Sequence, residues 1–351
     1  MNCKKNGAVI FVGPMCLNGI SSRGGDTLKN TILTRHLKTK YHKVYCIDTY
    51  RWEKKPWIFV LLFFELVLHY KTTLIVSANG VSSNRLFRFV KPLCQKRKTF
   101  YWAVGAVDRY FREGKFSIDT YQFLDGIFVQ GKSMENTLRT LGLSNAVYVP
   151  NSKFMPPVVQ KSVCKDGKVH FVFISRIEES KGCNYIFSAV DILNNKGYAG
   201  QFDVTFYGKI ENKIYGDAFL RLVENYESVN YRGLLDLSNL ENYNILAQYD
   251  VMLFPTYWPG EAFAGIFIDS YIAGLPVIAS DWNLNAEIVE DGDTGWIIPV
   301  HDVTALASRM QSVIDNPVVI SEMSKKCMDM AKQYDVCNVL SDENLVALGL
   351  L

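Results

Sequence analysis

The chain has 351 residues, of which 48% are hydrophobic and 21% are charged, and it contains no low-complexity tract. This length allows two domains with full hydrophobic cores, and the composition excludes disordered and fibrous classes of protein. The net charge of +3 hides an asymmetry, because residues 1–158 contain 24 Lys and Arg against 9 Asp and Glu, and the remainder contains 14 against 26. We therefore expect two domains, the first of which meets an anionic partner.

The first half of the chain alternates between short apolar runs and segments with helical spacing. The apolar runs lie at 8–13, 43–50, 72–78, 99–105, 126–131 and 146–151. Strands that alternate with helices predict a parallel sheet covered on both faces. The run at 8–13 is too short for the core of a signal peptide, and the eight cysteines form no CxxC pair. We therefore expect reduced thiols and a cytoplasmic location, and no metal site built from cysteines.

Two segments of this half combine apolar and basic residues. Residues 54–71 are apolar over about a dozen positions and interrupted by Glu65, which is too short a stretch to span a bilayer. Residues 84–98 mix aromatic side chains with six Lys and Arg. Either both segments rest peripherally on an anionic membrane surface at the inner face, or 56–68 is a buried core helix, which is the favoured interpretation of that stretch. Nucleic acid is not expected, because no recognition motif accompanies the charge.

A polar stretch at 152–168 with two adjacent prolines predicts a linker between two domains. Beyond it, apolar runs resume at 169–176, 202–208, 229–235, 249–256, 276–281 and 295–300. We expect an α/β protein of two Rossmann-like, doubly wound domains, 1–158 and 159–351, facing each other across a cleft. The last helix is a candidate to cross back to the first domain. In such sheets ligands bind beyond the carboxyl ends of the strands.

The segment "PTYWPGEAFAGIFIDSYIAGLPVIASD" carries two carboxylates, Glu261 and Asp269, directly after the strand predicted at 249–256. The residues after Glu261 have helical spacing, and Gly274 is well placed to end that helix. Glu261 is therefore expected at the mouth of a strand–helix unit, and Asp269 in the early turns of the helix, within reach of ribose hydroxyls.

Small residues separate the two carboxylates. Ala262, Ala264 and Gly265 lie near the predicted N-terminus of the helix and would let a ligand approach the backbone. Free N–H groups and the helix dipole favour a phosphate there. An acid for a sugar, a cradle for phosphate and an acid for ribose together match the chemistry of a nucleotide-sugar.

The same segment resembles the signature of glycosyltransferase family 4, whose members have the GT-B fold. The family pattern opens with E-G-F-G, repeats a Glu after seven residues and continues to a D-G-x-T-G loop, here "DGDTG" at 291–295. This chain departs by placing Asp269 where the second Glu stands and alanines at two glycine positions. The resemblance implies that Glu261 positions the donor sugar, Asp269 the ribose, and backbone N–H groups near Phe263–Gly265 the phosphates.

Further matches lie upstream. Arg176 and Lys181 resemble the family's R-x4-K, and two cations at the end of a strand can clamp a diphosphate and stabilise it as a leaving group. Gly233 in "VNYRGLL" matches a glycine that the family places near the nucleobase. Gly24 and Gly25 open a predicted helix and resemble the family's first loop, which borders the donor phosphates and the acceptor.

The resemblance implies a retaining glycosyltransferase that moves a sugar from a nucleotide-sugar to an acceptor hydroxyl, on a sugar or lipid-linked glycan of surface polysaccharide biosynthesis. No cofactor besides this co-substrate and no metal are expected, since Asp291 and Asp293 belong to the matching turn. One alternative is a non-catalytic nucleotide-sugar-binding protein, favoured by the lost glycines and Asp269. Another is a GT-B epimerase or phosphorylase, which would need further catalytic carboxylates or a lysine-held cofactor. A dinucleotide oxidoreductase is disfavoured, because no GxGxxG follows the first strand.

Overall fold

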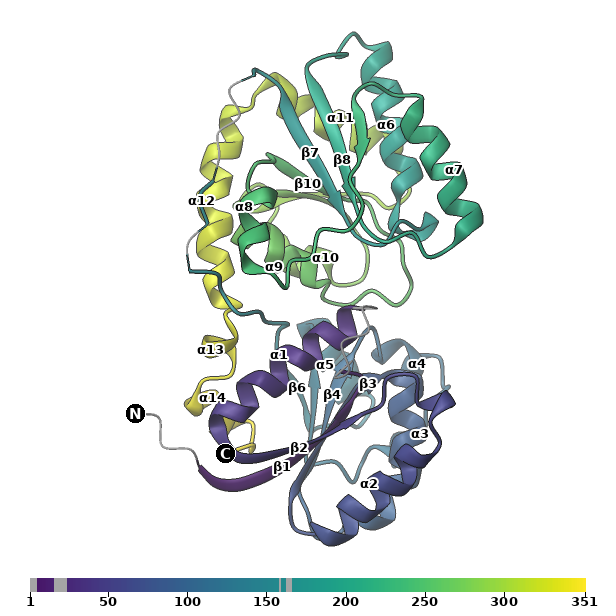
Figure 1. Cartoon of the computed structure of the whole chain (residues 1–351), viewed down its shortest axis with the longest axis vertical. Coiled ribbons are helices and arrows are strands. Elements are labelled where there is room, and N and C mark those ends of the chain that lie inside the picture. Colours follow the sequence, from purple (N-terminus) through teal and green to yellow (C-terminus); the bar gives the residue numbers. More distant parts are fainter. Residues whose placement is uncertain (1–4, 16–23, 158, 162–165) are drawn as a thin grey trace. The chain divides into compact units, whose positions relative to one another are not determined.

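The computed structural model describes residues 5–15, 24–157, 159–161 and 166–351, and its contacts divide the chain into two compact units (Figure 1). The N-terminal unit comprises Met1–Phe154 and Tyr334–Leu351, and the C-terminal unit comprises Met155–Gln333. The chain thus leaves the first unit at Phe154, where the sequence analysis placed the boundary at 158, and it returns to that unit at Tyr334. Cys3, Cys16 and Cys164, and most of the loop before Gly24, lie outside the described residues.

The N-terminal unit is built on a six-stranded sheet in the order β2-β1-β3-β4-β5-β6, with every paired neighbour parallel. Its strands are β1 (Lys5–Gly13), β2 (Tyr41–Asp48), β3 (Thr73–Asn79), β4 (Thr99–Val104), β5 (Gly126–Val129) and β6 (Ala146–Tyr148). Its helices include α1 (Gly25–Lys40), α2 (Trp57–Leu68), α3 (Gly80–Val90), α4 (Asp108–Arg112) and α5 (Lys132–Thr140). All four residues from Val9 to Val12 are 0% exposed, although alternate residues face opposite sides of the sheet. Both faces of the sheet are therefore covered at its centre, as predicted.

The end of the chain completes the core of this unit. Two short helices, α13 (Val336–Val339) and α14 (Asp342–Ala347), place Val336, Leu340 and Leu345 among the buried residues that surround β1 and β3. His36 of α1 contacts the carbonyl oxygen of Leu340 at 2.8 Å through Nε2. The N-terminal unit therefore depends on residues from both ends of the sequence.

The C-terminal unit contains a second parallel sheet of six strands, in the order β12-β11-β10-β7-β8-β9. Its strands are β7 (Val169–Ile174), β8 (Phe202–Tyr207), β9 (Val229–Tyr231), β10 (Val251–Phe254), β11 (Val277–Ser280) and β12 (Gly295–Ile298). Its helices are α6 (Cys183–Asn195), α7 (Lys213–Glu224), α8 (Tyr243–Leu246), α9 (Gly265–Ile272), α10 (Asn285–Ile288), α11 (Val303–Asp315) and α12 (Val318–Gln333). The predicted strands of both halves are confirmed as parallel sheets with flanking helices.

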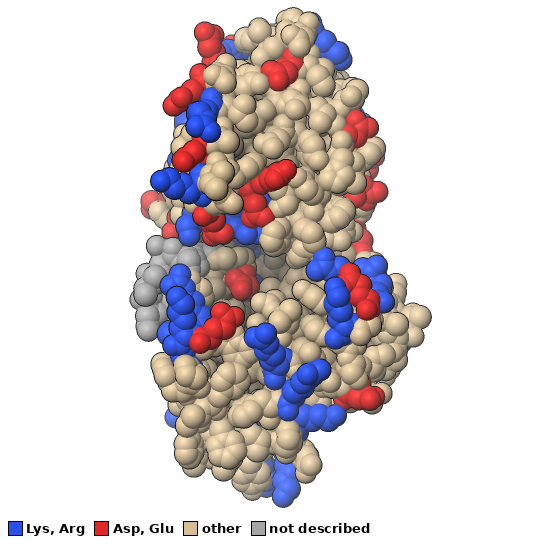
Figure 2. All heavy atoms as spheres, turned by 90° about the vertical axis from the view of Figure 1, so that its right-hand side faces the viewer, with Lys and Arg blue, Asp and Glu red and all other residues tan. Residues whose placement is uncertain are grey.

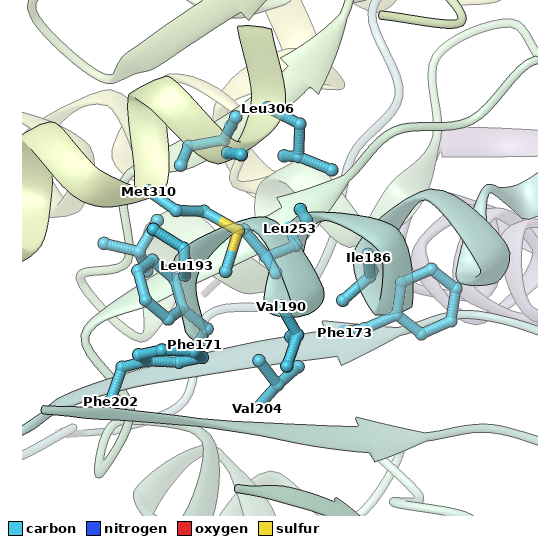
Figure 3. Packing of buried hydrophobic residues seen from close by; sticks show 14 of the residues in the cluster. Phe171, Phe173, Ile186, Val190, Leu193, Phe202, Val204, Leu253, Leu306 and Met310 are labelled. Carbon is cyan, nitrogen blue, oxygen red and sulfur yellow. The ribbon is translucent and has the colours of Figure 1, made fainter. Parts of the chain in front are cut away.

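One stripe of α6 shows why this sequence folds as a layered α/β unit. Ile186, Val190 and Leu193 follow the helical period and point toward Phe171 and Val204 of the sheet and toward Met310 of α11 (Figure 3). The remaining labelled residues of this cluster, Phe173, Phe202, Leu253 and Leu306, are each at most 1% exposed. This packing fixes β7, β8 and β10, whose carboxyl ends carry the predicted donor motifs.

The strand order reverses between β7 and β10. The chain runs outward from β7 through β8 to β9, then crosses to β10 on the other side of β7 and continues outward to β12. The loops that follow β7 and β10 diverge at such a switch point and leave room for a ligand. Arg176 follows β7 and Glu261 follows β10, so both predicted motifs lie at this point.

α2 differs from the favoured sequence interpretation. Only Ile58, Leu62 and Leu66 of its twelve residues are buried, so 57–68 is not a core helix. Among the helices that the structure describes, none has the length and apolar character needed to cross a membrane.

Candidate functional site

A buried ion pair joins the two predicted motifs of the C-terminal unit. Lys181 closes a short 3-10 helix (Glu179–Lys181) after β7, and its Nζ donates to Oε2 of Glu261, which lies in the loop after β10. The two side chains are only 6% and 12% exposed. Gly182 follows at φ +83°, where an added Cβ would lie 2.1 Å from the carbonyl oxygen of Pro255. Only glycine lets the chain turn into α6 this close to the β10 loop.

Arg176 and Lys181 contact the same aromatic ring. The guanidinium carbon of Arg176 is 4.7 Å from the ring centroid of Trp258, and Nζ of Lys181 is 5.7 Å from the same ring. Nη1 of Arg176 forms an ion pair with Glu178 at 2.9 Å, and the Arg176 side chain remains 37% exposed. Sequence reasoning missed Trp258, although an aromatic residue between a predicted strand and the Pro-Gly turn was the available signal. Two cations, one acid and one aromatic ring thus converge.

Backbone hydrogen bonds hold the loop that carries Glu261. The Glu261 N–H donates to the Trp258 carbonyl at 3.0 Å, and Nε1 of Trp282 donates to the same carbonyl at 2.7 Å. Nδ2 of Asn283, a residue at φ +49°, donates to the Glu261 carbonyl at 2.9 Å. The position of the Glu261 backbone is therefore set by the loop after β11 as well as by its own turn. No sequence pattern indicates these contacts.

The small residues between the carboxylates lie at the start of α9. Ala262 and Ala264 are 5% and 8% exposed, Phe263 is 4% exposed, and Gly265 is half-buried. Ala264 is the N-cap residue and has no side-chain oxygen with which to cap the first turn. The Phe267 N–H donates to the Ala264 carbonyl at 3.1 Å, but no side-chain cap serves the first turn, and such a helix start favours an anion. Gly265 gives the most open approach to it.

Asp269, which the sequence predicts within reach of ribose hydroxyls, lies buried between α8 and α9. Its side chain is 4% exposed, and Oδ1 accepts a hydrogen bond of 2.5 Å from the hydroxyl of Tyr243 in α8. Burial, followed by the charge of Asp269, raises the pKa of Tyr243 well above its usual range. The carboxylate of Asp, one methylene shorter than that of Glu, stays within the contact between α8 and α9. Tyr243 is a further residue that sequence reasoning missed.

The predicted glycines fall in different units. Gly233 follows β9 at φ +69°, and its carbonyl accepts a 2.7 Å hydrogen bond from the N–H of Gly208, which follows β8. It therefore lies at the same edge of the C-terminal sheet as the motifs of β7 and β10. Gly24 and Gly25 belong to the N-terminal unit, where they form the N-cap and first residue of α1 and are exposed.

A hollow of about 430 Å³ opens beside the motif that follows β7. Its lining residues come from the segments that follow β7, β8 and β10, including the start of α7, and are Glu178, Glu179, Ser180, Asn212, Tyr215 and Tyr257. Burial and the neighbouring Tyr185 raise the pKa of Tyr257 to about 12, so its hydroxyl is a hydrogen-bond donor at neutral pH. The lining offers polar groups of a kind that bind hydroxyl-rich ligands.

The structure also places the two aspartates of the predicted turn. Oδ1 of Asp291 accepts from the N–H of Ile297 at 3.0 Å, and Asp293 pairs with Lys326. Among the described residues, no three His, Cys, Asp or Glu side chains are grouped to hold a metal ion. Metal independence itself stays a prediction.

A family model matches the part of the chain that contains the site residues of the C-terminal unit. Residues 168–316 match the family model described as "Glycosyl transferases group 1". The chain is 27% identical over 147 residues to an uncharacterised 41.2 kDa protein of the Klebsiella pneumoniae cps region. It is 25% identical over 194 residues to the Staphylococcus aureus capsular polysaccharide biosynthesis glycosyltransferase CapM. These matches cover 41% and 54% of this chain, and 37% and 49% of the relatives' own lengths.

Solved structures extend the likeness to the whole fold. The lipopolysaccharide outer core galactosyltransferase WaaB superposes over 98% of this chain and 100% of its own, with a TM-score of 0.70 at 14% identity. Sucrose-phosphate synthase from Thermosynechococcus elongatus covers 98% and 99%, with a TM-score of 0.73 at 15% identity. Identities this low support the fold alone, which is GT-B.

Proposed function

We propose that this protein is a retaining glycosyltransferase, because residues 168–316 match the family model of glycosyl transferases group 1 and the chain has the GT-B fold. It would move a sugar from a nucleotide-sugar to an acceptor hydroxyl. The observation that carries the proposal is the buried pair of Lys181 and Glu261, held beside Arg176 and Trp258 at the switch point of the C-terminal sheet. Membership of glycosyltransferase family 4 in particular stays a prediction.

The proposed reaction assigns a role to each charged group. The bond between the sugar's anomeric carbon and the diphosphate breaks, the acceptor oxygen bonds to that carbon, and the acceptor proton goes to the departing diphosphate. Lys181 has three N–H donors, of which one serves Glu261, so the others can meet a phosphate oxygen. Arg176 and the N–H groups at the start of α9 share the developing negative charge. Glu261 positions the donor sugar.

The hollow and Gly233 lie where the rest of the donor would bind. We assign the nucleobase to the segment around Gly233, which ends β9, and the sugar and diphosphate to the β7 and β10 loops. Asp269 would support the ribose site through Tyr243 rather than by direct contact, since its carboxylate is already committed to that hydroxyl. A role of Gly24 and Gly25 in binding the donor phosphates stays a prediction from the sequence.

We propose a UDP-sugar as the donor and a sugar or lipid-linked glycan of surface polysaccharide biosynthesis as the acceptor. Two named proteins support this choice. An Escherichia coli relative, 32% identical over 84 residues, is a UDP-Gal:alpha-D-GlcNAc-diphosphoundecaprenol alpha-1,3-galactosyltransferase, and a structural neighbour from Anabaena is described in complex with UDP-glucose. The reaction would then take place in the cytoplasm, where nucleotide-sugars are made.

The first experiment is a thermal-shift panel of UDP-, GDP-, ADP- and TDP-sugars on wild type and Arg176→Ala. We expect a UDP-sugar to raise the unfolding temperature of wild type and not of the variant, because Arg176 holds the diphosphate. Arg309→Ala is the matched control, since Arg309 also stacks on a tryptophan, Trp296, at 5.5 Å but lies on α11. It should respond as wild type does.

Incubation with the stabilising donor and a panel of glycan acceptors then separates transfer from binding. A product with the donor's anomeric configuration, read by NMR, supports the retaining enzyme. Binding without any transfer favours the non-catalytic nucleotide-sugar-binding protein, and conversion of the free nucleotide-sugar to an epimer favours the epimerase. No shift with any nucleotide, in protein that unfolds cooperatively, contradicts the donor site.

A further inference from the structure

The helix α2 exposes an unusual surface for a protein that folds in water. Ten of the sixteen large hydrophobic residues that the described structure leaves exposed lie between 57 and 89. Seven belong to α2 itself and are 42% to 71% exposed: Trp57, Val60, Leu61, Phe63, Phe64, Val67 and Leu68. We call these seven residues the apolar face. A surface helix ordinarily carries charged or polar residues at such positions.

The apolar face is presented by a helix that is held firmly. Ile58, Leu62 and Leu66, spaced four residues apart, form the stripe that packs on the N-terminal unit. Phe59 contacts Trp52 at 5.0 Å and Phe89 of α3 at 5.4 Å between ring centroids. These contacts use the inner side of α2 and leave the apolar face outward. The apolar face is therefore exposed while α2 is packed on the folded N-terminal unit.

Basic residues surround the apolar face. Residues 51–98 contain ten Lys and Arg and only two Asp and Glu. Lys54 and Lys71, both exposed, lie at the two ends of α2, and exposed Arg85 and Arg88 lie on α3 beside Phe89. The one acid within α2, Glu65, is 26% exposed and lies 3.6 Å from His69. Figure 2 shows this side of the N-terminal unit, where uncharged surface adjoins mostly blue Lys and Arg.

We propose that the apolar face of α2 inserts into the surface of an anionic lipid bilayer, with the surrounding cations on the lipid phosphates. Twelve helical residues span about 18 Å, short of the roughly 30 Å of a hydrocarbon core, so α2 lies in the plane of the interface. Apolar insertion and electrostatic attraction act together at such interfaces. A second copy of the chain is a less suitable partner for the apolar face. A symmetric contact would bring the Lys and Arg residues around the two apolar faces close together, and these like charges repel.

This inference is independent of the glycosyl transfer proposed above, and its test needs no turnover. The full chain is sedimented with phosphatidylcholine vesicles that contain or lack phosphatidylglycerol. We expect binding only to the anionic vesicles, and release as salt is raised from about 0.1 M to about 1 M, where the Debye length falls from about 10 Å to about 3 Å. The variant Phe64→Glu/Leu68→Glu should lose more than about tenfold in partition coefficient.

Matched variants separate insertion from unspecific effects. Ile214→Glu changes a residue that is 84% exposed on α7 of the C-terminal unit and should bind as wild type does. Lys54→Glu/Lys71→Glu should weaken binding to anionic vesicles while the apolar face is intact. Brominated lipid should quench part of the tryptophan fluorescence of wild type, and Trp57→Phe, which removes a tryptophan that is 59% exposed, should abolish that quenching.

Three results would overturn the proposal. One is a wild-type protein that stays in the supernatant with anionic vesicles, and another is equal binding by Phe64→Glu/Leu68→Glu. The third is a dimer, measured by light scattering, that the same double variant converts to a monomer, since the apolar face would then be an interface between copies. All substituted side chains are exposed, so circular dichroism should show unchanged folding.

Discussion

The hydrogen bond from Tyr243 to Asp269 joins α8 to α9 behind the candidate site. We expect Tyr243→Phe to lower the free energy of unfolding by about 1.5–3 kcal/mol, because a buried carboxylate loses a charge-assisted donor at 2.5 Å. Urea denaturation of wild type and variant measures this difference in the free energy of unfolding. Tyr198→Phe is the matched control, because Tyr198 donates to Asp315 at 2.9 Å in an exposed position. Equal losses of unfolding free energy in the two variants would show that the buried hydrogen bond to Asp269 contributes no more to stability than the exposed one to Asp315.

Lys29 makes the stability of the N-terminal unit depend on pH. Its side chain is 6% exposed, its Nζ donates to the Ala103 carbonyl at 3.0 Å, and burial lowers its pKa from 10.5 to about 7. Between these pKa values the unfolded chain binds more protons than the folded one, so the free energy of unfolding rises with pH across that window. Below about pH 7 both states are protonated and this contribution stays constant.

The variant Lys29→Met isolates this effect. From about pH 7 to about pH 9, we expect wild type to gain stability relative to the variant by up to about 1.4 kcal/mol per pH unit, measured by urea denaturation. If the difference in the free energy of unfolding between wild type and Lys29→Met did not change with pH, this would contradict a lowered Lys29 pKa.

At the scale of single residues, the sequence predicted the charges of the site but not their supports. The spacing of Arg176, Lys181 and Glu261 relative to their strands was enough to place all three at one sheet edge. Trp258, Trp282 and Tyr243 escaped prediction because each acts through a contact with a residue distant in the sequence, and an aromatic side chain by itself indicates only burial. The same limit explains Asp269, whose burial depends on α8.

At the scale of elements, the turn between Lys181 and α6 is a point where one added methyl group should displace the site. Gly182 and Gly197 have nearly equal φ values, +83° and +87°, but only the Cβ of residue 182 would meet backbone, at Pro255. We expect Gly197→Ala to cost about 1–2 kcal/mol through its φ alone, and Gly182→Ala clearly more through the added clash. Chemical denaturation of each variant measures its loss of unfolding free energy.

Gly182→Ala should also remove the thermal shift that a nucleotide-sugar produces, since the clash separates the β7 loop from the β10 loop. Gly197→Ala should keep that shift. Similar stability and similar ligand response in the two variants would mean that the approach of Gly182 to Pro255 does not position Lys181.

The strands were the most predictable elements and α2 the least. The central strands, such as β3, β4, β7 and β10, are short apolar runs between polar or glycine-containing segments, so their composition indicates burial on both faces. α2 has the same apolar composition, and composition alone could not distinguish a helix buried on all sides from one exposed on most of them. What decides is the number of neighbouring elements, and α2 packs on its unit along the stripe of Ile58, Leu62 and Leu66 and through the ring of Phe59.

At the scale of the whole molecule, the two units do not divide the sequence at one point. The last residues supply Val336, Val339, Leu340, Leu345 and Leu350 to a core whose other buried members all lie before residue 155. Helical spacing makes the return of the last helix only a candidate, because it does not say which unit a helix packs on. α12 stays in the C-terminal unit, and the return begins at Tyr334.

The stability of the N-terminal unit should therefore be sensitive to a residue near the end of the chain. Leu345 is 0% exposed within the core around β1 and β3, so Leu345→Ala should destabilise that unit by about 2–5 kcal/mol. Hydrogen exchange should then show faster exchange in β3 and β4, with β7 and β8 unchanged. Leu306→Ala, in the core of the C-terminal unit, should produce the reverse pattern. Faster exchange in both units of either variant would mean that the two units unfold as one.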